Sequence, residues 1–364
     1  MTDNKRIIGL DILRSFAILA VIFYHSIKFL PNIPTWYYAL ASRGWAGVDL
    51  FFVLSGYLIG GQILSKKFQQ SRGVKSTIDF WIRRWTRTLP LYWTVLFFYV
   101  ALKPILFHAP FAGGFNWRWI FFLQNTAPMF DFGQSWSLCI EEQFYFFLPF
   151  VAGALLLLRM KSSWIWLLPI LMSITLRFLR ARHIGTYEMT VLPPAEFVWN
   201  FRLPTWMMLD GLSIGIFLAQ THKFWSQWRS SLKRNMGLIG GILLVTVLYI
   251  YPEYPHTSFA VSIFYTYLSL AFGLLLIAFE GQQSFIGCKW LQKIALCSYS
   301  IYLWHEAFSR LFARLPNHSE FFGEWAIQLV VYLVLVFVFS WASYSWIEKP
   351  GLRARTPLLR SLGV

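Results

Sequence analysis

The chain has 364 residues, of which 57% are hydrophobic, 20% are aromatic and only 13% are charged. Soluble globular domains carry about a quarter charged residues, so this composition excludes an ordinary soluble protein and predicts a polytopic membrane protein. The net charge of +16 would by itself suit a nucleic-acid binder. The basic residues, however, are scattered over short loops rather than gathered on one soluble domain, so we expect no nucleic-acid partner.

Ten hydrophobic runs, each roughly 17 to 23 residues long, are sufficient to cross a bilayer as helices. They cover residues 8–30, 45–64, 89–108, 138–158, 164–180, 203–219, 236–252, 258–279, 291–312 and 325–347. We therefore predict an all-α fold with about ten transmembrane helices and no soluble domain. Residues 1–364 form a single domain in this prediction, with residues 351–364 as a cytoplasmic tail.

The distribution of Lys and Arg predicts the orientation of the chain. If the N-terminus is cytoplasmic, 21 of the 32 basic residues lie on the cytoplasmic side, as the positive-inside rule requires, and an even number of spans places both termini there. The first run is too long for a signal peptide and no small-residue cleavage site follows it closely, so we expect it to stay. Cys139, Cys288 and Cys297 lack the spacing of a disulfide framework or a zinc site.

The first hydrophobic run carries three ionisable residues, Asp11, Arg14 and His25. An Arg or Asp near the centre of a membrane helix costs roughly 2.5 to 3.5 kcal/mol, so such residues indicate a functional site. Arg14 and His25 are eleven residues apart, which places them on the same helix face about 16 Å apart along the axis. This helix face therefore carries a cation, Arg14, and a proton acceptor, His25, at two different depths in the bilayer.

The next two helices add an acid and a basic pair. Asp49 lies about one turn from the outer end of the second helix, either as part of a site or as a polar tether between helices. Arg84 and Arg87 share a helix face at i, i+3, which suits a phosphate clamp, although a basic cluster at this place also serves as a topological anchor. Pro90 suits the first turn of the third transmembrane helix.

The fourth and ninth helices carry further candidates. Glu141 and Glu142 lie just inside the outer end of the fourth helix, where only one of the two can face a given cavity. We favour Glu141, which lies about one turn below Trp136. His305 in the ninth helix lies at nearly the depth of His25, as either a packed side chain or a site residue.

The middle of the chain is less informative. Arg177, Arg180 and Arg182 lie at the outer end of the fifth helix, where they could attract an anionic acceptor or extend their charged groups to the membrane interface. We favour the second interpretation. The sixth to eighth helices are nearly uncharged apart from Asp210 and are interpreted as a scaffold.

On this topology the candidates form two layers. The outer third holds bases and acids, namely His25, Asp49, Glu141 and His305. The inner third and the cytoplasmic rim hold guanidinium groups, namely Arg14, Arg84 and Arg87. This spacing is compatible with a long ligand that is anionic at its inner end, such as an acyl-coenzyme A with its thioester near His25.

The motifs also resemble a known family, the membrane acyltransferase-3 family of bacterial acyltransferases. The resemblance runs to about Pro350 and is carried by LDILRSFAILAVIFYHS, GVDLFFVLSGYLIGG, RWTR, WSLCIEEQFYFFLP and SYSIYLWH. It implies that Arg14 and His25 are essential, that Arg84 and Arg87 serve the acyl donor, and that Glu141 is the motif glutamate. It also implies a place in the bacterial cytoplasmic membrane.

Members of this family acylate cell-envelope glycans such as O-antigen, exopolysaccharide and peptidoglycan, and some modify macrolide antibiotics. Some members add a C-terminal periplasmic hydrolase-like transferase domain, which we do not expect after Val364. The resemblance therefore predicts the reaction class more narrowly than the acceptor.

We predict an acyl-CoA-dependent O-acyltransferase, most simply an acetyltransferase, acting on a hydroxyl of a cell-envelope glycan or glycolipid. His25 is the expected general base and Glu141 the residue that orients it. Supporting roles are expected for Asp11, Asp49, Trp136 and His305. Acyl-CoA is a co-substrate in this prediction, membrane lipids are partners, and no tightly bound cofactor or metal is expected. Homo-oligomerisation is left open.

Three alternatives remain at this point. A proton-coupled transporter or flippase of a glycan-related substrate would also place His and acids in helices, but it would release no coenzyme A. A structural membrane protein would tolerate loss of His25. A metal site built from the His and acidic residues has no local ligand spacing to support it. Cys139 could carry an acyl group, but direct transfer is preferred because no adjacent base is evident.

Overall fold

The computed structural model describes residues 7–63, 73–108, 110–112, 114–127, 131–160, 162–185, 189, 191–250, 255, 257–282, 288–314 and 324–362. Every regular element in these ranges is helical, which confirms the all-α prediction. Parts of the prediction lie outside the described residues. These are residue 64 and residues 251–252 at the ends of two predicted spans, the last two residues of the predicted tail, and six of the basic residues counted on the cytoplasmic side. Those six are Lys5, Arg6, Lys66, Lys67, Arg72 and Lys161.

Among the described residues, eight helices are long and apolar enough to cross a membrane. The chain is therefore a multi-pass membrane protein. The predicted spans at 203–219 and 291–312 are not among these eight, so the count of ten stays a prediction, as do the orientation and the membrane in which the chain resides.

The longer helices of the first half are α1 (Ile8–Ser26), α3 (Gly47–Ile63), α5 (Val74–Phe97), α7 (Trp136–Leu157) and α8 (Leu167–Ile184). Those of the second half are α11 (Asp210–Trp225), α12 (Ser230–Ile250), α13 (Ser258–Glu280), α14 (Cys288–Phe312), α15 (Glu324–Ser343) and α16 (Lys349–Ser361). Shorter helices are α2 (Thr35–Ala41), α6 (Lys103–Phe107) and α10 (Pro194–Phe197). Single π-helical turns are η2 (Phe98–Leu102), η7 (Val198–Arg202) and η9 (Tyr344–Glu348).

The contacts divide the chain into two compact units. The first unit comprises Met1–Leu19, Trp45–Lys66 and Arg159–Leu296, and the second comprises Ala20–Gly44, Lys67–Leu158 and Cys297–Val364. The division falls inside α1 and α14, so each of these helices contributes residues to both units.

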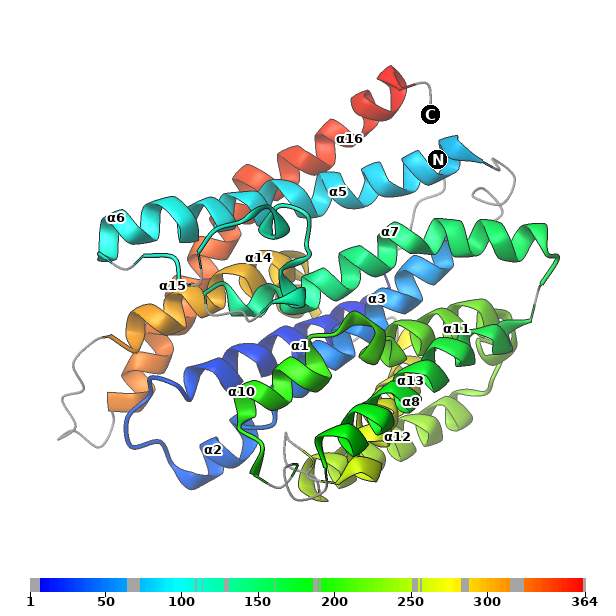
Figure 1. Ribbon diagram of the computed structural model, residues 1–364, viewed down its shortest axis with the longest axis horizontal. Coiled ribbons are helices and arrows are strands. Elements are labelled where there is room, and N and C mark those ends of the chain that lie inside the picture. The colour runs from blue at the N-terminus through cyan, green and yellow to red at the C-terminus, as the bar shows by residue number, and fades with distance from the viewer. Residues whose placement is uncertain are drawn as a thin grey trace. The chain divides into compact units, whose positions relative to one another are not determined.

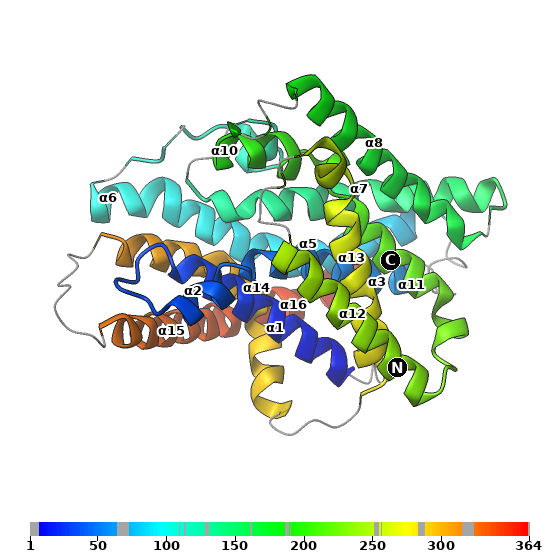
Figure 2. The same cartoon turned by 90° about the horizontal axis from the view of Figure 1, so that it is seen from below.

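The first unit is a bundle in which α11 packs against α3, and α13 packs against α8, α11 and α12. Figures 1 and 2 both show α8, α11, α12 and α13 gathered together. Glycines permit the closest approach: a Cβ on Gly56 would lie 2.1 Å from the carbonyl oxygen of Leu212, and one on Gly215 would lie 2.3 Å from that of Val53. Small residues at these positions let the two backbones meet, as is typical of membrane helices.

The second unit contains α5, α7, α15 and α16, and α16 lies alongside α5 (Figure 1). Pro90 lies inside α5, so the carbonyl of Thr86 lacks its usual helical N–H donor. Gly351 of α16 approaches that same carbonyl, and a Cβ there would lie 2.4 Å from the oxygen. The proline in one helix and the glycine in the other therefore fall at one contact.

The prediction that Pro90 opens the third transmembrane helix is wrong. The helix begins at Val74, and the apolar helical stretch extends from Val74 to Leu106. Its first part is amphipathic rather than uniformly apolar, which a search for hydrophobic runs does not detect. An ion pair between Arg83 and Asp79, at 2.7 Å with i, i+4 spacing, supports this first part.

Candidate active site

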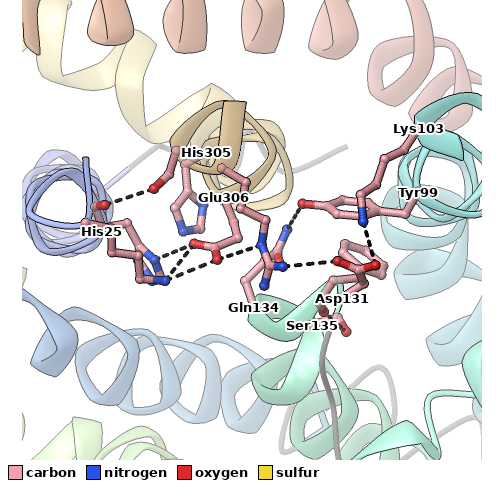
Figure 3. A network of polar contacts seen from close by, with 12 residues as sticks. His25, Tyr99, Lys103, Asp131, Gln134, Ser135, His305 and Glu306 are labelled. Carbon is pink, nitrogen blue, oxygen red and sulfur yellow. Dashed lines mark hydrogen bonds and ion pairs between the residues drawn. The ribbon is translucent and has the colours of Figure 1, made fainter. Parts of the chain in front are cut away.

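His25, in the last turn of α1, contacts an acidic side chain that is itself buried. Its Nδ1 lies 2.5 Å from Oε2 of Glu306, an ion pair by distance without the linear geometry of a hydrogen bond. The Glu306 side chain is only 4% exposed and the His25 side chain is 18% exposed. Ser309, one turn further along α14 from Glu306, donates a hydrogen bond to the His25 carbonyl at 2.9 Å. One contact from α14 is therefore made to the imidazole of His25 and one to its backbone, and Figure 3 shows Glu306 beside the ring.

Two cations also bind the Glu306 carboxylate. Lys28 Nζ lies 3.1 Å from both carboxylate oxygens, and Arg310 Nε lies 3.0 Å from Oε1. Both cations reach solvent, with side-chain exposures of 47% and 38%. Because opposite charges favour the ionised form of a carboxyl group, this arrangement keeps a negative charge beside His25.

A second imidazole adjoins the first. The ring centroids of His25 and His305 are 4.6 Å apart, and His305 is fully buried. Its Nδ1 lies 2.7 Å from the carbonyl oxygen of Tyr302, which can only accept, so Nδ1 carries a proton and Nε2 presents a lone pair. Nε2 has no hydrogen-bond partner within the part of the chain that the structure describes. Nε2 of His305 is therefore a buried proton acceptor beside His25 that no described residue uses.

The network continues beyond Glu306 through Arg310. Arg310 Nη1 lies 3.0 Å from Asp131 Oδ1, and Lys103 Nζ lies 2.5 Å from Asp131 Oδ2. The backbone N–H of Ala112 also donates to Asp131, at 2.7 Å. Figure 3 shows this chain of contacts running from His25 to Lys103. Three cations and two carboxylates therefore share one connected network.

His25, His305 and Glu306 could in principle hold a metal ion, because one ligand atom from each lies within 4.8 Å of the others. The neighbouring charges argue against a cation there. Lys28 and Arg310 already contact the same carboxylate, and each repels a further positive charge. Proton transfer is the chemistry that this arrangement favours, and the absence of a metal stays a prediction.

The predicted donor arginines lie near other acids of the second unit. The Arg84 guanidinium lies over the ring of Tyr145, 4.1 Å from its centroid, and interacts electrostatically with Glu142 and Glu141. Arg87 interacts electrostatically with Glu348, a buried acid that accepts a hydrogen bond from Ser300. Arg84 and the two glutamates of α7 therefore belong to one cluster.

The sequence predicts that Glu141 orients the imidazole of His25. The carboxylate that contacts His25 is Glu306, whereas Glu141 and the buried Glu142 interact with Arg84. Trp136 is the first residue of α7 and is partly exposed. The assignments of Glu141 and Trp136 to the site stay predictions.

The remaining predicted residues lie in the first unit. Arg14 Nη1 is 3.6 Å from Asp11 Oδ1, on the same face of α1. Asp49 is buried and pairs with Arg202 at 3.1 Å, and the Arg202 guanidinium lies 5.0 Å from the ring centroid of Trp45. The Asp49 contact fits the polar tether that the sequence left as one of two interpretations.

The interpretation of Arg177 as an interfacial residue is wrong. Its side chain is 0% exposed and forms two hydrogen bonds with Asp210, at 2.7 and 3.0 Å. It also donates to the carbonyl of Ser262 and to the hydroxyl of Thr266. Asp210 is therefore the sequence feature that could have indicated a buried Arg177, because a buried charge needs an oppositely charged partner.

Sequence reasoning missed most of the network around His25. The residues not singled out are Lys28, Lys103, Asp131, Glu306 and Arg310. Part of the signal was present in helical spacing, since Glu306 directly follows His305 and Arg310 is four residues further on. Asp131 precedes α7 in an irregular loop, where no periodicity indicates which side chain points inward.

The geometry can be compared with known proteins. A family profile described as an acyltransferase domain matches residues 7–345 of this chain. The chain belongs to this acyltransferase family. The comparison with solved structures gives no match.

Several curated proteins resemble this acyltransferase domain over nearly its whole length. YrhL of Bacillus subtilis, named for peptidoglycan O-acetylation, is 26% identical over 96% of the chain, and OatA of Staphylococcus aureus, named as an O-acetyltransferase, is 27% identical over 96%. A protein of Staphylococcus aureus strain COL, named for O-acetyl transfer, is 30% identical over 94%. The chain spans only 55%, 58% and 56% of these relatives.

Proposed function

We propose that this chain transfers an acyl group, most simply acetyl, from acyl-CoA to a hydroxyl of a cell-envelope glycan, with His25 as general base. Family membership and the O-acetyltransferase names of its relatives support the reaction class. Because one relative is named for peptidoglycan O-acetylation, peptidoglycan is the first acceptor to test. The observation that carries the proposal is the contact between His25 and the buried carboxylate of Glu306.

Glu306 takes the orienting role in this mechanism. A carboxylate beside Nδ1 holds a proton on that nitrogen and leaves Nε2 of His25 to accept another. As the acceptor hydroxyl oxygen attacks the thioester carbonyl, its proton passes to Nε2 of His25. The carbon–sulfur bond then breaks, the ester forms, and coenzyme A leaves as a thiolate that is protonated by the imidazolium. Glu306 stabilises the imidazolium between these two steps.

His305 has a separate task in the proposal. Its buried Nε2 can accept a hydrogen bond from a second hydroxyl of the acceptor, which would set the attacking oxygen beside His25. Arg84 and Arg87 are proposed to bind the phosphates of the acyl donor, since guanidinium groups form paired hydrogen bonds with phosphate. Arg14 of α1 is also proposed to serve the acyl donor. Glu141 and Glu142 would then position Arg84.

The test is an acyl-transfer assay with the purified chain in nanodiscs, acetyl-CoA and peptidoglycan fragments. Thiol release measures donor use, and mass spectrometry detects the acetylated product. His25→Ala is expected to lower the transfer rate by roughly 10² to 10⁴-fold, the usual contribution of a general base. The matched control is His222→Ala, because His222 also pairs with a glutamate, Glu280 at 2.9 Å, in the first unit.

The proposal fails if the His25 variant transfers as fast as the wild type at equal folded protein. A transporter or flippase would instead move its substrate without releasing thiol, and that result would replace the acyltransferase assignment. An effect of His222→Ala equal to that of His25→Ala would mean that the assay reports general destabilisation rather than catalysis.

A further inference from the structure

Two helical stretches of the second unit are longer than a membrane requires. Val74–Leu106, which contains α5, has 33 residues, and Glu324–Ser361, which contains α15 and α16, has 38. At 1.5 Å per residue they measure about 50 Å and about 57 Å, whereas the hydrocarbon layer is about 30 Å thick. The polar parts are residues 74–88 at the start of the first stretch and α16 at the end of the second. These polar parts therefore extend beyond the hydrocarbon layer, where a water-soluble ligand can reach them.

The two polar parts pack against each other with opposite chain directions. α16 lies alongside α5 (Figure 1). Gly351 of α16 meets α5 at Thr86, since a Cβ on this glycine would lie 2.4 Å from the Thr86 carbonyl oxygen. Arg355, one turn further along α16, interacts electrostatically with Arg83 and Asp79, which lie nearer the start of α5. The packing of the two helices therefore brings the Arg355 side chain to the Arg83 side chain.

This pair of polar segments carries far more positive than negative charge. Each segment has four basic residues, and Asp79 is the one acidic residue of the two. The basic residues are Lys75, Arg83, Arg84 and Arg87 in α5 and Lys349, Arg353, Arg355 and Arg360 in α16. The Asp79 carboxylate lies 2.7 Å from both Nε and Nη2 of Arg83. One carboxylate therefore serves two adjacent guanidinium groups, Arg83 and Arg355, and a second anion would relieve the repulsion between them.

Both guanidinium groups have N–H donors that such an anion can use. Asp79 engages Nε and Nη2 of Arg83, which leaves Nη1. The Arg355 side chain forms no hydrogen bond or ion pair within the part of the chain that the structure describes. Water reaches both side chains, because Arg83 is 30% exposed and Arg355 is half-buried. Adjacent guanidinium groups with accessible N–H donors are suited to binding a phosphate.

The position of this arginine pair indicates which phosphate it binds. In the proposed function, Arg84 and Arg87 bind phosphates of the acyl donor, and Arg83 adjoins the first in sequence and lies one helical turn from the second. Coenzyme A carries a diphosphate and, separately on its ribose, a 3′-phosphate. We propose that Arg83 and Arg355 bind the 3′-phosphate of acyl-CoA, while Arg84 and Arg87 bind the diphosphate. This assignment rests on the proposed function and gives α16 a part in recognising the donor.

The experiment measures donor binding without an acceptor. The purified chain in phosphatidylcholine nanodiscs is titrated by calorimetry with coenzyme A and with 3′-dephospho-coenzyme A, which lacks only the phosphate in question. We expect coenzyme A to bind roughly tenfold more tightly, because charge-assisted hydrogen bonds contribute at least that much. A second set of nanodiscs contains phosphatidylglycerol as well, and it tests whether a lipid phosphate occupies the arginine pair instead. The affinity ratio should be the same in both sets.

Arg355→Gln is the informative variant, because it removes one guanidinium group and leaves the pair of Arg83 with Asp79 in place. The affinity ratio should fall to about twofold or less, mainly through weaker binding of coenzyme A. Arg355→Lys keeps the charge without the forked donors and should give an intermediate ratio. The matched control is Arg353→Gln, an exposed arginine two residues away that points about 160° from Arg355 around the same helix, and it should retain the wild-type ratio. Thermal unfolding checks that all three variants are folded.

Equal affinity of the wild type for both probes, an unchanged ratio in Arg355→Gln, or an equal fall in Arg353→Gln would each overturn the assignment. A ratio that disappears when phosphatidylglycerol is added would assign the arginine pair to lipid headgroups instead. Failure of the proposed function gives different results. Equal affinity together with His25-dependent transfer removes the 3′-phosphate site alone, whereas no binding of coenzyme A removes the donor and this site together. A preserved ratio with transfer that does not depend on His25 removes the mechanism alone.

Discussion

Each unit of this protein buries arginine and carboxylate side chains, but the two units do so differently. In the first unit, Arg177 and Asp210 are 0% and 2% exposed and form two hydrogen bonds with each other. In the second unit, the carboxylate of Glu306 is shared among one histidine and two cations that reach solvent. The first arrangement pairs one charge with one opposite charge, whereas the second holds more positive than negative groups.

This difference is the one expected between a structural polar contact and a functional one. Charges in a membrane-spanning bundle are tolerated when each is neutralised and hydrogen-bonded, as for Arg177 and Asp210. A network with excess charge and an unused acceptor such as His305 Nε2 would cost free energy without a ligand. Groups of this kind are characteristic of sites that bind or transfer something. The comparison can therefore be tested by asking which variants lose stability and which lose activity.

The largest expected effect is on stability, in the first unit. Asp210→Ala leaves the fully buried guanidinium of Arg177 without its carboxylate, which should lower the free energy of unfolding by about 3 to 5 kcal/mol. Replacing both partners, as in Arg177→Met with Asp210→Leu, should recover most of this loss. Denaturant unfolding in detergent, followed by tryptophan fluorescence, measures both.

The control for this variant is Asp79→Ala, which breaks the pair with Arg83 whose side chains are 30% and 25% exposed. Exposed pairs contribute about 0.2 to 1 kcal/mol, so this variant should unfold nearly like the wild type. If Asp79→Ala were as destabilising as Asp210→Ala, burial would not be the reason for the larger loss.

The next effect is on activity, in the second unit. Glu306→Gln removes the negative charge beside His25 but keeps the shape of the side chain, and should lower kcat by roughly 10²-fold because the imidazolium loses its stabilising partner. Stability should change less than in Asp210→Ala, since Lys28 and Arg310 can both turn to solvent. Single-turnover thiol release and denaturant unfolding of the same samples test both parts.

A matched control is Glu280→Gln, which removes the carboxylate of the other histidine–glutamate pair, with His222. Transfer should be unaffected there. Should the two variants lose equal activity, or should Glu306→Gln lose stability instead of kcat, the network around His25 would be structural like that of Arg177.

The comparison also explains what could be predicted from the sequence. The all-α membrane fold followed from hydrophobic run length, and the choice of His25 as a candidate site residue followed from the cost of ionisable residues in a bilayer. The partner of His25 could not be predicted in the same way. The helices α1 and α14 are distant in the sequence, and their hydrophobic periodicity does not indicate which of their faces are in contact. Glu306 stands next to His305 in the sequence and was overlooked in favour of Glu141, which shares a motif with Glu142.

Other differences have local causes. The start of α5 at Val74 was missed because its first half is amphipathic, and Pro90 was interpreted as a helix start although it lies inside the helix. Arg177 was interpreted as interfacial from its position near the end of a hydrophobic run. That position does not reveal its partner Asp210, which is 33 residues away in the sequence. Hydrophobic runs thus predicted which segments are helical and apolar, but ion pairs between helices required coordinates.

A smaller effect, on KM for the acceptor, tests which ring nitrogen of His305 binds the acceptor. His305→Asn retains an amide donor near the position of Nδ1, where it can still reach the Tyr302 carbonyl, whereas His305→Gln places an amide near the position of Nε2. If Nε2 binds the acceptor, Asn should raise KM for the acceptor roughly tenfold and Gln should restore part of it. If the buried ring only packs, both variants should lose stability and retain KM.

The smallest effect is expected for Lys28, the most exposed cation that contacts Glu306. Its side chain is 47% exposed, so its attraction to Glu306 is screened by water and salt, and Lys28→Gln should change transfer less than threefold. The loss should disappear at high ionic strength, where the wild-type contact is already weakened. A loss as large as that of Glu306→Gln, independent of salt, would instead mean that Lys28 acts on the reacting groups, because a solvent-screened contact cannot produce it. Transfer rates measured across a salt series for both variants therefore separate a cation that only tunes the carboxylate from one that takes part in catalysis.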